Sequence, residues 1–404
     1  MKTPPAPDFR SPSFLRQHIN WIMGFYNPRA TDPRGGMYHY FLDDGTVFDR
    51  RTRHLVNATR FVITHAMVYK LTGEARYHAS VHHAVDFLRK AFLDPATGGY
   101  AWMIDWHEGQ ATVLDETRHC YGMAFVMLAY AHALKSGIVE ARGWLAETFD
   151  LAEKHLWGPA AGLYADEASP HWRLSSYRGQ NANMHACEAM ISAYAATKDR
   201  RYIERAETLA HNITVRQAAL ASNMIWEHYH QDWSVDWDYN LHDKTNIYRP
   251  WGYQPGHHTE WAKLLLQLDS YLPADWHLPR SEVLFKAGLT HAWDAEHGGL
   301  HYGFAPDTSI CDGDKYHWVQ AESFAAAALL AIRTGQPEYW AWYSKIWAYC
   351  WEHFVDHEQG AWFRILDAAN LNHTREKSPG GKVDYHNIGA CFDVLRSMGE
   401  LEGE

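Results

Sequence analysis

The sequence predicts an all-α protein whose helices form an (α/α)6 barrel, that is, six helical hairpins arranged in two concentric rings. Two observations support this fold. A short phrase with an acidic residue, a polar turn, glycines and an aromatic residue or methionine returns along the chain, and apolar helical segments separate its copies. Such a repeat constrains the whole architecture. A unit of roughly 65 residues accommodates two helices of about 15 residues and one substantial loop.

Four copies of the phrase are clear. They read DPRGGMY at 32–38, DPATGGY at 94–100, DAEHGGL at 294–300 and DHEQGAW at 356–362. A weaker copy lies at 157–164, and the period leaves room for a diverged one near 226–235. Six copies predict six hairpins, with the turns and their aromatic side chains over one mouth of the barrel.

The segments between the copies have two kinds of helical pattern. Segments 61–69, 121–134 and 324–332 are apolar on more than one face, as buried helices are. Segment 202–213 is amphipathic and offers Arg205 to solvent. Alternation of buried and half-buried helices is what an inner and an outer ring require. The alternative is an irregular all-helical protein whose turns are alike by coincidence.

No linker or charge block interrupts the 404 residues, so we expect a single domain over residues 1–404. A hydrophobic share of 47% is ample for its core. The Pro-rich start, 1–13, predicts an irregular N-terminal arm, and 399–404 predicts a short acidic tail.

Composition excludes several classes of protein. A net charge of −11 argues against nucleic-acid binding, which needs a basic surface. There is no signal-peptide pattern and no apolar run long enough for a membrane span. The five scattered cysteines predict reduced thiols in a cytoplasmic protein.

Tryptophan and histidine are unusually frequent, with 19 Trp and 28 His. Trp stacks on the apolar faces of sugar rings but also fills large cores, whereas His supplies metal ligands and acid–base groups near neutral pH. In a helical barrel without a phosphate-binding loop, this composition suggests carbohydrate chemistry.

The most informative segment is WGYQPGHHTEW at 251–261. Its Pro-Gly turn predicts a helix that starts near His257, and His257, Glu260 and Trp261 then share one helix face. A carboxylate beside a histidine can fix the tautomer of the ring and raise its pKa. The alternative is a capping histidine with a surface glutamate.

Segment 177–190 places Asn181, His185 and Glu188 on one stripe of an apolar helix. Polar groups that are buried without partners are costly, so this stripe must face solvent or a polar pocket. The apolar residues that follow favour the pocket.

Further candidates begin other apolar helices. Arg60 leads into the 61–69 helix and needs an acceptor, either a ligand hydroxyl or an ion-pair partner. Trp318 and Glu322 are again four residues apart, and Tyr121 fits either a site or a core. Near the end of the chain, Asp384 and His386 precede the last apolar run. In a closed barrel, His386 and the mid-chain His257 could lie close together, as proton transfer on two sides of one substrate requires.

These phrases resemble the N-acylglucosamine 2-epimerase superfamily, and within it most closely the mannose-isomerase branch, with sulfoquinovose isomerase as a near relative. The resemblance rests on NANMHACEA at 181–189, PGHHTEW at 255–261, HWVQAE at 317–322 and the ending WFRILD…GGKVDYHN at 362–387. It covers nearly the whole chain. One departure is His258, where relatives often carry another residue, and this puts the assignment of His257 in question.

The resemblance implies an (α/α)6 barrel and the interconversion of D-mannose and D-fructose through a cis-enediol, with no metal and no other cofactor. His386 would move the proton between C2 and C1. His257, supported by Glu260, would assist ring opening and proton movement at the oxygens. The positions that match a monosaccharide site are Arg60, Tyr121, Asn181, His185, Trp318 and Glu322. The epimerases of the superfamily use two histidines on opposite faces of C2, so a 2-epimerase stays open.

Other classes of function stay open as well. An inverting glycoside hydrolase would need two carboxylates about 6.5–9.5 Å apart, for which Glu260, Glu322 and Asp384 are candidates. A metal-dependent isomerase has less support, because the sequence has no HExxH helix. A sugar-binding protein without catalysis is the third possibility. For a 6-sulfonate or 6-phosphate, Arg364 and Lys382 are candidate cations. The sequence leaves both a monomer and a homodimer open.

Overall fold

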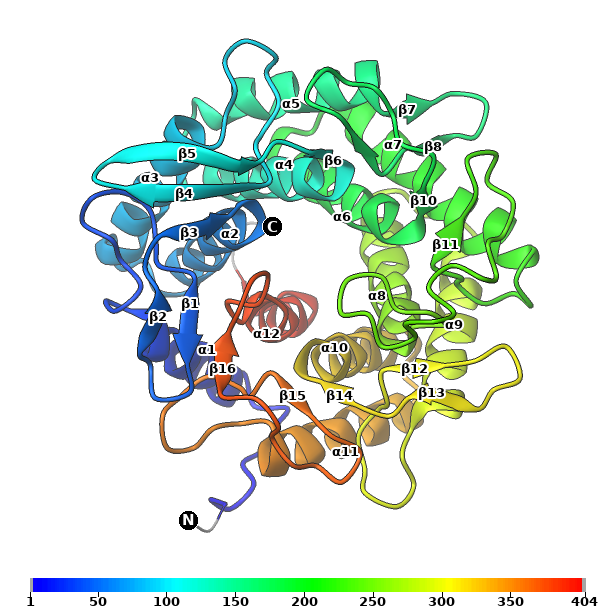
Figure 1. The fold of residues 1–404 in the computed structure, drawn as a ribbon. Helices are drawn as coiled ribbons and strands as arrows, with labels where there is room; N and C mark the ends of the chain where they lie inside the picture. Colours follow the sequence, from blue (N-terminus) through cyan, green and yellow to red (C-terminus); the bar gives the residue numbers. More distant parts are fainter. Residues whose placement is uncertain (1–2, 402–404) are drawn as a thin grey trace.

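The computed structural model describes residues 3–401 and shows two concentric rings of helices (Figure 1). The inner ring consists of α2 (Leu55–Thr72), α4 (Cys120–Lys135), α6 (Gln180–Thr197), α8 (Pro255–Tyr271), α10 (His317–Thr334) and α12 (Tyr385–Ser397). The outer ring consists of α1 (Pro12–Tyr26), α3 (Ala75–Ala91), α5 (Ala141–His155), α7 (Arg200–His211), α9 (His277–Ala292) and α11 (Pro337–His353). The prediction of an (α/α)6 barrel is confirmed.

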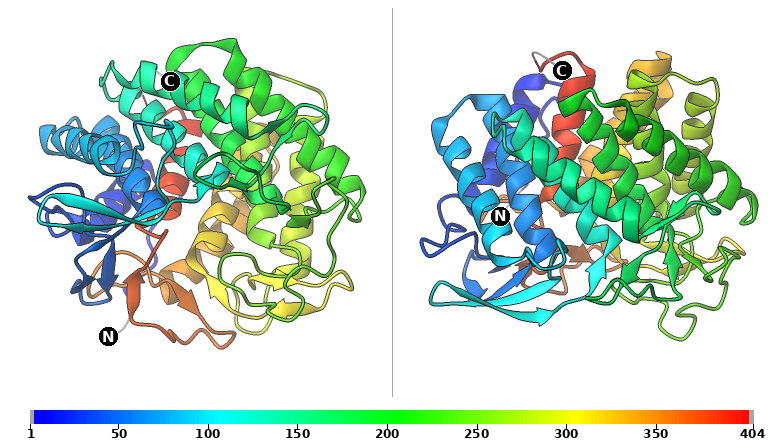
Figure 2. Two further views of the ribbon diagram at one scale, coloured as in Figure 1. Left: turned by 45° about the horizontal axis from the view of Figure 1, so that its top comes forward. Right: turned by 90° about the horizontal axis from the view of Figure 1, so that it is seen from above.

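The ring closes between the two ends of the chain. Each inner helix packs on the outer helix that follows it, except α12, which packs on α1. The last inner helix, α12, also contacts the first, α2. Helix α1 is therefore the outer partner of the sixth hairpin, although it is first in sequence (Figures 1 and 2).

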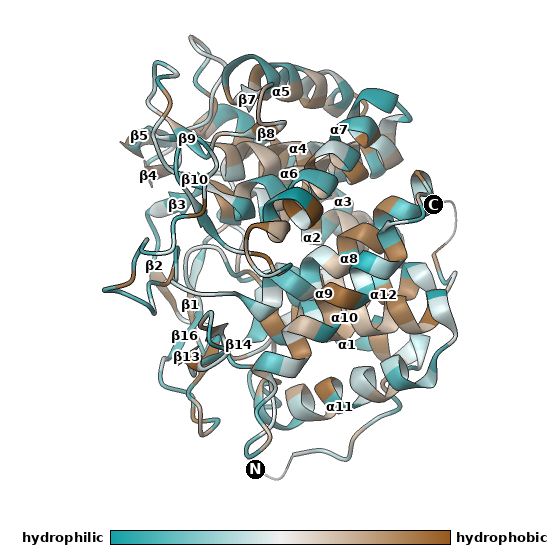
Figure 3. Cartoon of the chain, turned by 90° about the vertical axis from the view of Figure 1, so that its right-hand side faces the viewer, coloured by the Kyte–Doolittle hydropathy of each residue, from teal (hydrophilic) through white to brown (hydrophobic). Residues whose placement is uncertain are grey.

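Burial follows the hydrophobic pattern. Inner helices such as α4 and α10 are buried on nearly all sides, as their continuous apolar sequences predict. The amphipathic α7 buries one stripe that includes Tyr202, Ile203 and Leu209. Figure 3 shows hydrophilic residues along α7 on the outside and hydrophobic residues along α10 and α12. Helix α7 continues into a π-helical segment, η1 (Asn212–Gln217).

Short strands gather at one end of the barrel, where the inner helices begin (Figure 2, right). They are β1 (Tyr40–Leu42), β2 (Val47–Asp49), β3 (Thr52–His54), β4 (Met103–His107), β5 (Gln110–Asp115), β6 (Arg118–His119), β7 (Trp157–Gly158), β8 (Leu163–Tyr164), β9 (Glu167–Ala168), β10 (Arg178–Gly179), β11 (His228–Tyr229), β12 (Gly303–Phe304), β13 (Ile310–Asp312), β14 (Lys315–Tyr316), β15 (Ile365–Leu366) and β16 (Glu376–Ser378). The prediction of an all-helical core did not include these strands.

The strands tie each connecting loop to the next. A strand that leads into an inner helix pairs antiparallel with the following loop, in the pairs β3–β4, β6–β9, β10–β11, β14–β15 and β16–β1. A single bridge between Tyr253 and Phe304 makes the link before α8. The same contacts satisfy helix starts, because the amide N–H groups of Leu55, Cys120 and Gln180 donate to carbonyls of the following loop. The loop end of the barrel is thus a closed belt.

The repeated phrase has a structural role that the sequence did not reveal. In each clear copy, the initial aspartate accepts a hydrogen bond from a buried cation in the strand that leads into an inner helix. The pairs are Asp32–Arg53 at 2.8 Å, Asp94–Arg118 at 2.7 Å, Asp294–Lys315 at 2.8 Å and Asp356–Lys377 at 2.5 Å. Each pair fixes the turn after an outer helix to the strand that leads into the next inner helix. The predicted diverged copy is shifted, because the turn after η1 lies at 220–224.

We expect Asp294→Ala to lower the free energy of unfolding by about 3–5 kcal/mol, because it leaves the ammonium group of the fully buried Lys315 without its carboxylate. Urea denaturation followed by Trp fluorescence measures this loss. Asp94→Ala is the matched control and should cost less, because 34% of the Asp94 side chain is exposed. Equal stability of Asp294→Ala and the wild type would contradict the structural role of the pair.

The ends of the chain match their predictions in part. The arm before α1 is irregular from residue 3, and Phe9 stacks on Trp347 of α11 with 5.4 Å between ring centroids. Of the predicted acidic tail, 402–404 lies outside the described residues, as do residues 1 and 2 of the arm. All five cysteines are free. Among the described residues, none of the helices has both the length and the apolar character needed to cross a membrane. A single domain over 1–404 stays a prediction.

Candidate active site

The predicted site residues converge at the loop end of the barrel, on the first two turns of the inner helices. Tyr121, Asn181, His257, Trp318 and His386 occupy the second or third position of their helices. Arg60, His185, Glu260 and Glu322 occupy the sixth position of theirs, about one turn further along the barrel axis. The helix starts, aligned by the belt, therefore place two layers of polar side chains around the axis.

His386 is held by two neighbours. Its Nδ1 lies 2.7 Å from Oε1 of Glu322, and its Nε2 lies 3.3 Å from the guanidinium nitrogen Nη2 of Arg60. Burial lowers the pKa of His386 well below its ordinary value, and the guanidinium group of Arg60 lowers it further. A neutral ring that donates from Nδ1 to Glu322 has its lone pair on Nε2, which is the arrangement of a base.

Arg60 joins several parts of the site. The guanidinium nitrogen Nη2 of Arg60 also donates to the hydroxyl of Tyr121 at 3.2 Å, and Nη1 donates to the carbonyl of Gly381. The guanidinium group lies over the rings of Phe125 and Tyr385, 4.6 and 4.7 Å from their centroids. Its charge is therefore fixed beside Nε2 of His386.

The partner of His257 differs from the prediction. Its Nδ1 lies 2.9 Å from Oε1 of Glu227, and no hydrogen bond links it to Glu260. Glu227 accepts a second hydrogen bond from Gln180, whose own carbonyl accepts one from Trp261. Although burial opposes ionisation, His257 lowers the pKa of Glu227. The prediction that Glu260 supports His257 was wrong because Glu227 reaches the ring from the neighbouring loop, a contact between elements that helix spacing does not reveal.

Sequence reasoning missed Glu227. It lies just before β11, at the point where that loop joins the belt, and the amide of Gln180 donates to its carbonyl at 3.1 Å. The available signal was an acidic residue inside the aromatic run Ile225-Trp-Glu-His-Tyr229, since a buried carboxylate needs a partner.

His258 does not belong to the site. It is fully buried, its Nδ1 donates to the carbonyl of Gln254 at 2.8 Å, and its Nε2 accepts from the amide of Ile225 at 3.1 Å. Burial lowers the pKa of His258 to about 4. Of the two adjacent histidines, only His257 faces the other site residues.

Glu260 lies among other acidic groups without a hydrogen bond of its own. Both of its carboxyl oxygens are buried and have no partner among the described residues. Oε1 is 3.9 Å from Nδ1 of His185. Burial and the neighbouring Glu322 raise the pKa of Glu260 well above its ordinary value. A neutral carboxyl group of this kind can donate a proton or a hydrogen bond to a ligand oxygen.

His185 and Glu188 form the predicted polar stripe. Nδ1 of His185 lies 2.8 Å from Oε2 of Glu188, and the hydroxyl of Tyr385 donates to Oε1 of the same carboxylate. The prediction of a pocket rather than a surface is therefore supported by their burial. Asn181 lies one turn closer to the mouth, and its buried Oδ1 is without a partner among the described residues.

Trp318 lies between the two candidate catalytic histidines. Its ring centroid is 5.1 Å from that of His257 and 5.6 Å from that of His386. The ring packs on the start of α8, where a Cβ added to Gly256 would lie 2.5 Å from it. The glycine of the Pro-Gly turn is therefore required for this packing.

The carboxylates do not have the geometry of an inverting hydrolase. Oxygens of Glu260 and Glu322 lie within 4.8 Å of each other, below the separation of about 6.5–9.5 Å that leaves room for a water. Asp384 is fully buried and accepts hydrogen bonds from Tyr26 and Lys382 at 2.5 and 2.6 Å, so it has a structural role.

The sequence contains no HExxH motif, but separate helices bring metal-ligand types together. Within residues 3–401, two groups could hold an ion, one of His185, Glu188 and Glu260, the other of Glu260, Glu322 and His386. In both, the histidine Nδ1 already contacts a carboxylate, and Nζ of Lys263 lies 2.5 Å from Oε2 of Glu322. A cation bound there would have to compete with this ammonium group.

The candidate cations for a sugar sulfonate or phosphate are engaged elsewhere. Lys382 donates to the carbonyl of Trp362 at 2.9 Å and to Asp384. Arg364 pairs with Glu376 at 3.3 Å. Neither supplies a cationic pocket beside the two histidines.

Known proteins resemble this chain over nearly its whole length. The family model of N-acylglucosamine 2-epimerase matches residues 36–390. D-mannose isomerase of Marinomonas mediterranea is 50% identical over 394 residues, which cover 97% of this chain and 99% of that protein. A crystal structure of D-mannose isomerase has 51% identity and a TM-score of 0.95, covering 97% of this chain and 100% of that one. The structure of cellobiose 2-epimerase from Spirochaeta thermophila, at 22% identity, shares the fold with a TM-score of 0.85, covering 98% and 100%. The chain belongs to the N-acylglucosamine 2-epimerase family.

Proposed function

We propose that this protein is an aldose–ketose isomerase that interconverts D-mannose and D-fructose through a cis-enediol intermediate. The observation that carries the proposal is His386, whose Nδ1 is bound by Glu322 while its Nε2 lies beside Arg60. The proposal is supported by 50% identity to a D-mannose isomerase over nearly the whole chain. The 2-epimerase alternative has weaker support, because the solved cellobiose 2-epimerase shares 22% identity and shows the fold alone.

The reaction starts from the open-chain aldose. Nε2 of His386 takes the proton from C2, the electron pair of that bond forms the C1–C2 double bond, and the carbonyl oxygen on C1 becomes an enediolate oxygen. Arg60, fixed beside Nε2, stabilises the developing negative charge. His386 then returns its proton to C1.

Proton movement between the oxygens completes the reaction. The hydroxyl proton on O2 leaves and O1 gains a proton, so the product differs from the substrate only in the positions of two hydrogens. His257, oriented by Glu227, is placed to open the sugar ring and to carry protons at the oxygens. Acid and base groups each contribute about 10²- to 10⁴-fold to such a step.

The other candidates bind the substrate. Trp318 provides an apolar face between the two histidines, and Tyr121 and His185 lie edge to face, with 5.0 Å between their ring centroids. Asn181 and Glu260 offer unpaired buried oxygens to sugar hydroxyls. A monomeric or homodimeric state and a cytoplasmic location belong to the same proposal, and sedimentation of the purified protein tests the first.

We expect Glu260→Gln to retain substantially more activity than Glu260→Ala, because glutamine keeps a neutral hydrogen-bond donor where the carboxyl group is proposed to be protonated. Steady-state kcat and KM with D-mannose measure the difference. If glutamine were as damaging as alanine, Glu260 would have to act as a carboxylate or by donating a full proton.

The main test follows the product by NMR after incubation of the protein with D-mannose and excess EDTA in D2O. Fructose would support the proposal, and the amount of deuterium at C1 would report how far the proton on His386 exchanges with solvent. Glucose without fructose would indicate a 2-epimerase. Fructose formation that EDTA abolishes and added metal restores would overturn the metal-free mechanism. No change would lead to tests with N-acetylglucosamine and sulfoquinovose, and reducing sugar released from an oligosaccharide would revive the hydrolase alternative.

A further inference from the structure

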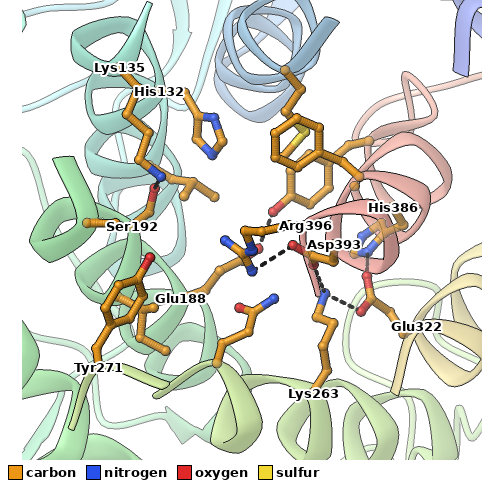
Figure 4. A pocket seen from close by; sticks show the side chains of 18 residues that line it. His132, Lys135, Glu188, Ser192, Lys263, Tyr271, Glu322, His386, Asp393 and Arg396 are labelled. Atoms are coloured by element: carbon orange, nitrogen blue, oxygen red, sulfur yellow. Dashed lines mark hydrogen bonds and ion pairs between the residues drawn. The ribbon is translucent and has the colours of Figure 1, made fainter. Parts of the chain in front are cut away.

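A buried lysine lies behind the proposed base, on the side away from the loops. Lys263 is on α8, about one turn beyond Glu260, and is 3% exposed. Its Nζ lies 2.5 Å from Oε2 of Glu322 and 3.5 Å from Oδ2 of Asp393. Figure 4 shows Lys263 between these two carboxylates, with His386 on the opposite side of Glu322.

The two oxygens of Glu322 therefore have different partners. Oε1 faces Nδ1 of His386 at 2.7 Å, and Oε2 faces Lys263. We propose that Lys263 is a positioning residue that holds Glu322 as a carboxylate, so that Glu322 accepts the Nδ1 proton of His386 and leaves Nε2 free as the base. This inference rests on the proposed function of His386 and adds a residue to it.

Other charges around this pair come from every inner helix that packs against it. They are Arg60 of α2, His132 and Lys135 of α4, His185 and Glu188 of α6, Glu260 of α8, and His386, Asp393 and Arg396 of α12. The guanidinium nitrogen Nη2 of Arg396 pairs with Oδ1 of Asp393 at 2.9 Å, so Asp393 also forms an ion pair with Arg396. Arg60 is directed at Nε2 of His386. Lys263 is thus the cation in direct contact with Glu322 among the described residues.

The ammonium group is needed because the site disfavours charge on Glu322. Burial raises the pKa of Glu322, and Lys263 opposes this rise. A protonated Glu322 would present a hydrogen where His386 also presents one, and the ring would lose its orientation. A cavity of about 40 Å³ borders Lys263, Glu322 and His386 and also touches Gln267 and Asp393.

The test compares the pH dependence of kcat/KM for D-mannose in four proteins: the wild type, Lys263→Met, Lys263→Arg and Lys315→Met. Removing the ammonium group raises the pKa of Glu322. The pH at which kcat/KM falls on the acidic side of the profile (the acidic limb) should therefore rise by about 1–3 pH units in Lys263→Met. Its kcat should fall more than its KM rises. Lys263→Arg should return the acidic limb to its position in the wild type. Lys315→Met removes another fully buried lysine from an ion pair and should lower stability without moving the limb. An unmoved limb in Lys263→Met would overturn the proposal.

A second measurement needs neither a stable Lys263 variant nor an activity assay. In the wild type labelled with ¹⁵N-histidine, the His386 signals should show a proton on Nδ1 and none on Nε2 at neutral pH. His386→Gln identifies these signals by their loss. A ring protonated on Nε2 would overturn the positioning role even if D-mannose is isomerised. Conversely, a wild type that has the expected tautomer but forms no fructose would refute the proposed function and leave this inference standing.

Discussion

Replacement of His386 by alanine is expected to abolish turnover of D-mannose while sugar binding persists. The imidazole is the group proposed to carry the proton between C2 and C1, and loss of a positioned general base costs typically about 10²- to 10⁴-fold. The other binding groups, including Arg60, Trp318 and Glu260, stay in place. Steady-state kinetics measures the loss, and calorimetric titration with D-mannose measures binding.

The matched control for this variant is His258→Ala. His258 is also a buried histidine of the loop end, but its two nitrogens bond only to backbone groups. This control is expected to unfold at a lower temperature and to keep its turnover number at temperatures where it is folded. Full activity in His386→Ala would refute the mechanism, and equal loss in both variants would point to a structural effect.

Glu322→Gln is expected to reduce kcat nearly as much as the loss of His386, although it changes one atom. The amide can donate its N–H to Nδ1 of His386, which favours the tautomer with a proton on Nε2 and removes the base. In the Ser–His–Asp triad, the corresponding aspartate-to-asparagine change lowers kcat by about 10⁴-fold for this reason. We expect at least about 10²-fold here, with little change in KM.

Glu260→Gln makes the same chemical change at the neighbouring carboxyl group. It should have a much smaller effect, because Glu260 makes no hydrogen bond to either histidine ring that is proposed to move protons. The pair of variants therefore separates tautomer control from loss of a charge. Glu322→Gln with wild-type kcat would mean that His386 is oriented by other groups.

The fold was predictable because it is a repeat. The glycine turns recur at nearly constant spacing, and each lies between a half-buried and a buried helix, so periodicity alone predicts six hairpins. The belt of strands was not predictable, since its members are two to six residues long and pair with a loop one repeat away. Pairs such as Asp294–Lys315 were missed because a charged residue before an apolar helix does not identify its partner across the intervening hairpin loop.

The residues of the site were predictable, but their partners were only partly so. Helix spacing correctly places Asn181 and His185 on one stripe, because both belong to one element. Contacts between elements follow from the ring geometry. Glu322 bonds to His386 across two helices, and Glu227 reaches His257 from a loop, so neither pair is encoded by local spacing. Lys263 was missed for the same reason, since a lysine in an apolar helix reveals no partner.

The pairing of α1 with α12 has a consequence for synthesis on the ribosome. Helix α1 precedes the other helices in the chain, yet α12, the helix on which it mainly packs, is the last of them to leave the exit tunnel. That final helix also carries the proposed base. A nascent or truncated chain without α12 therefore leaves the apolar face of α1 partly uncovered and lacks the proposed base at the same time. Synthesis of α12 thus closes the ring and supplies the base together.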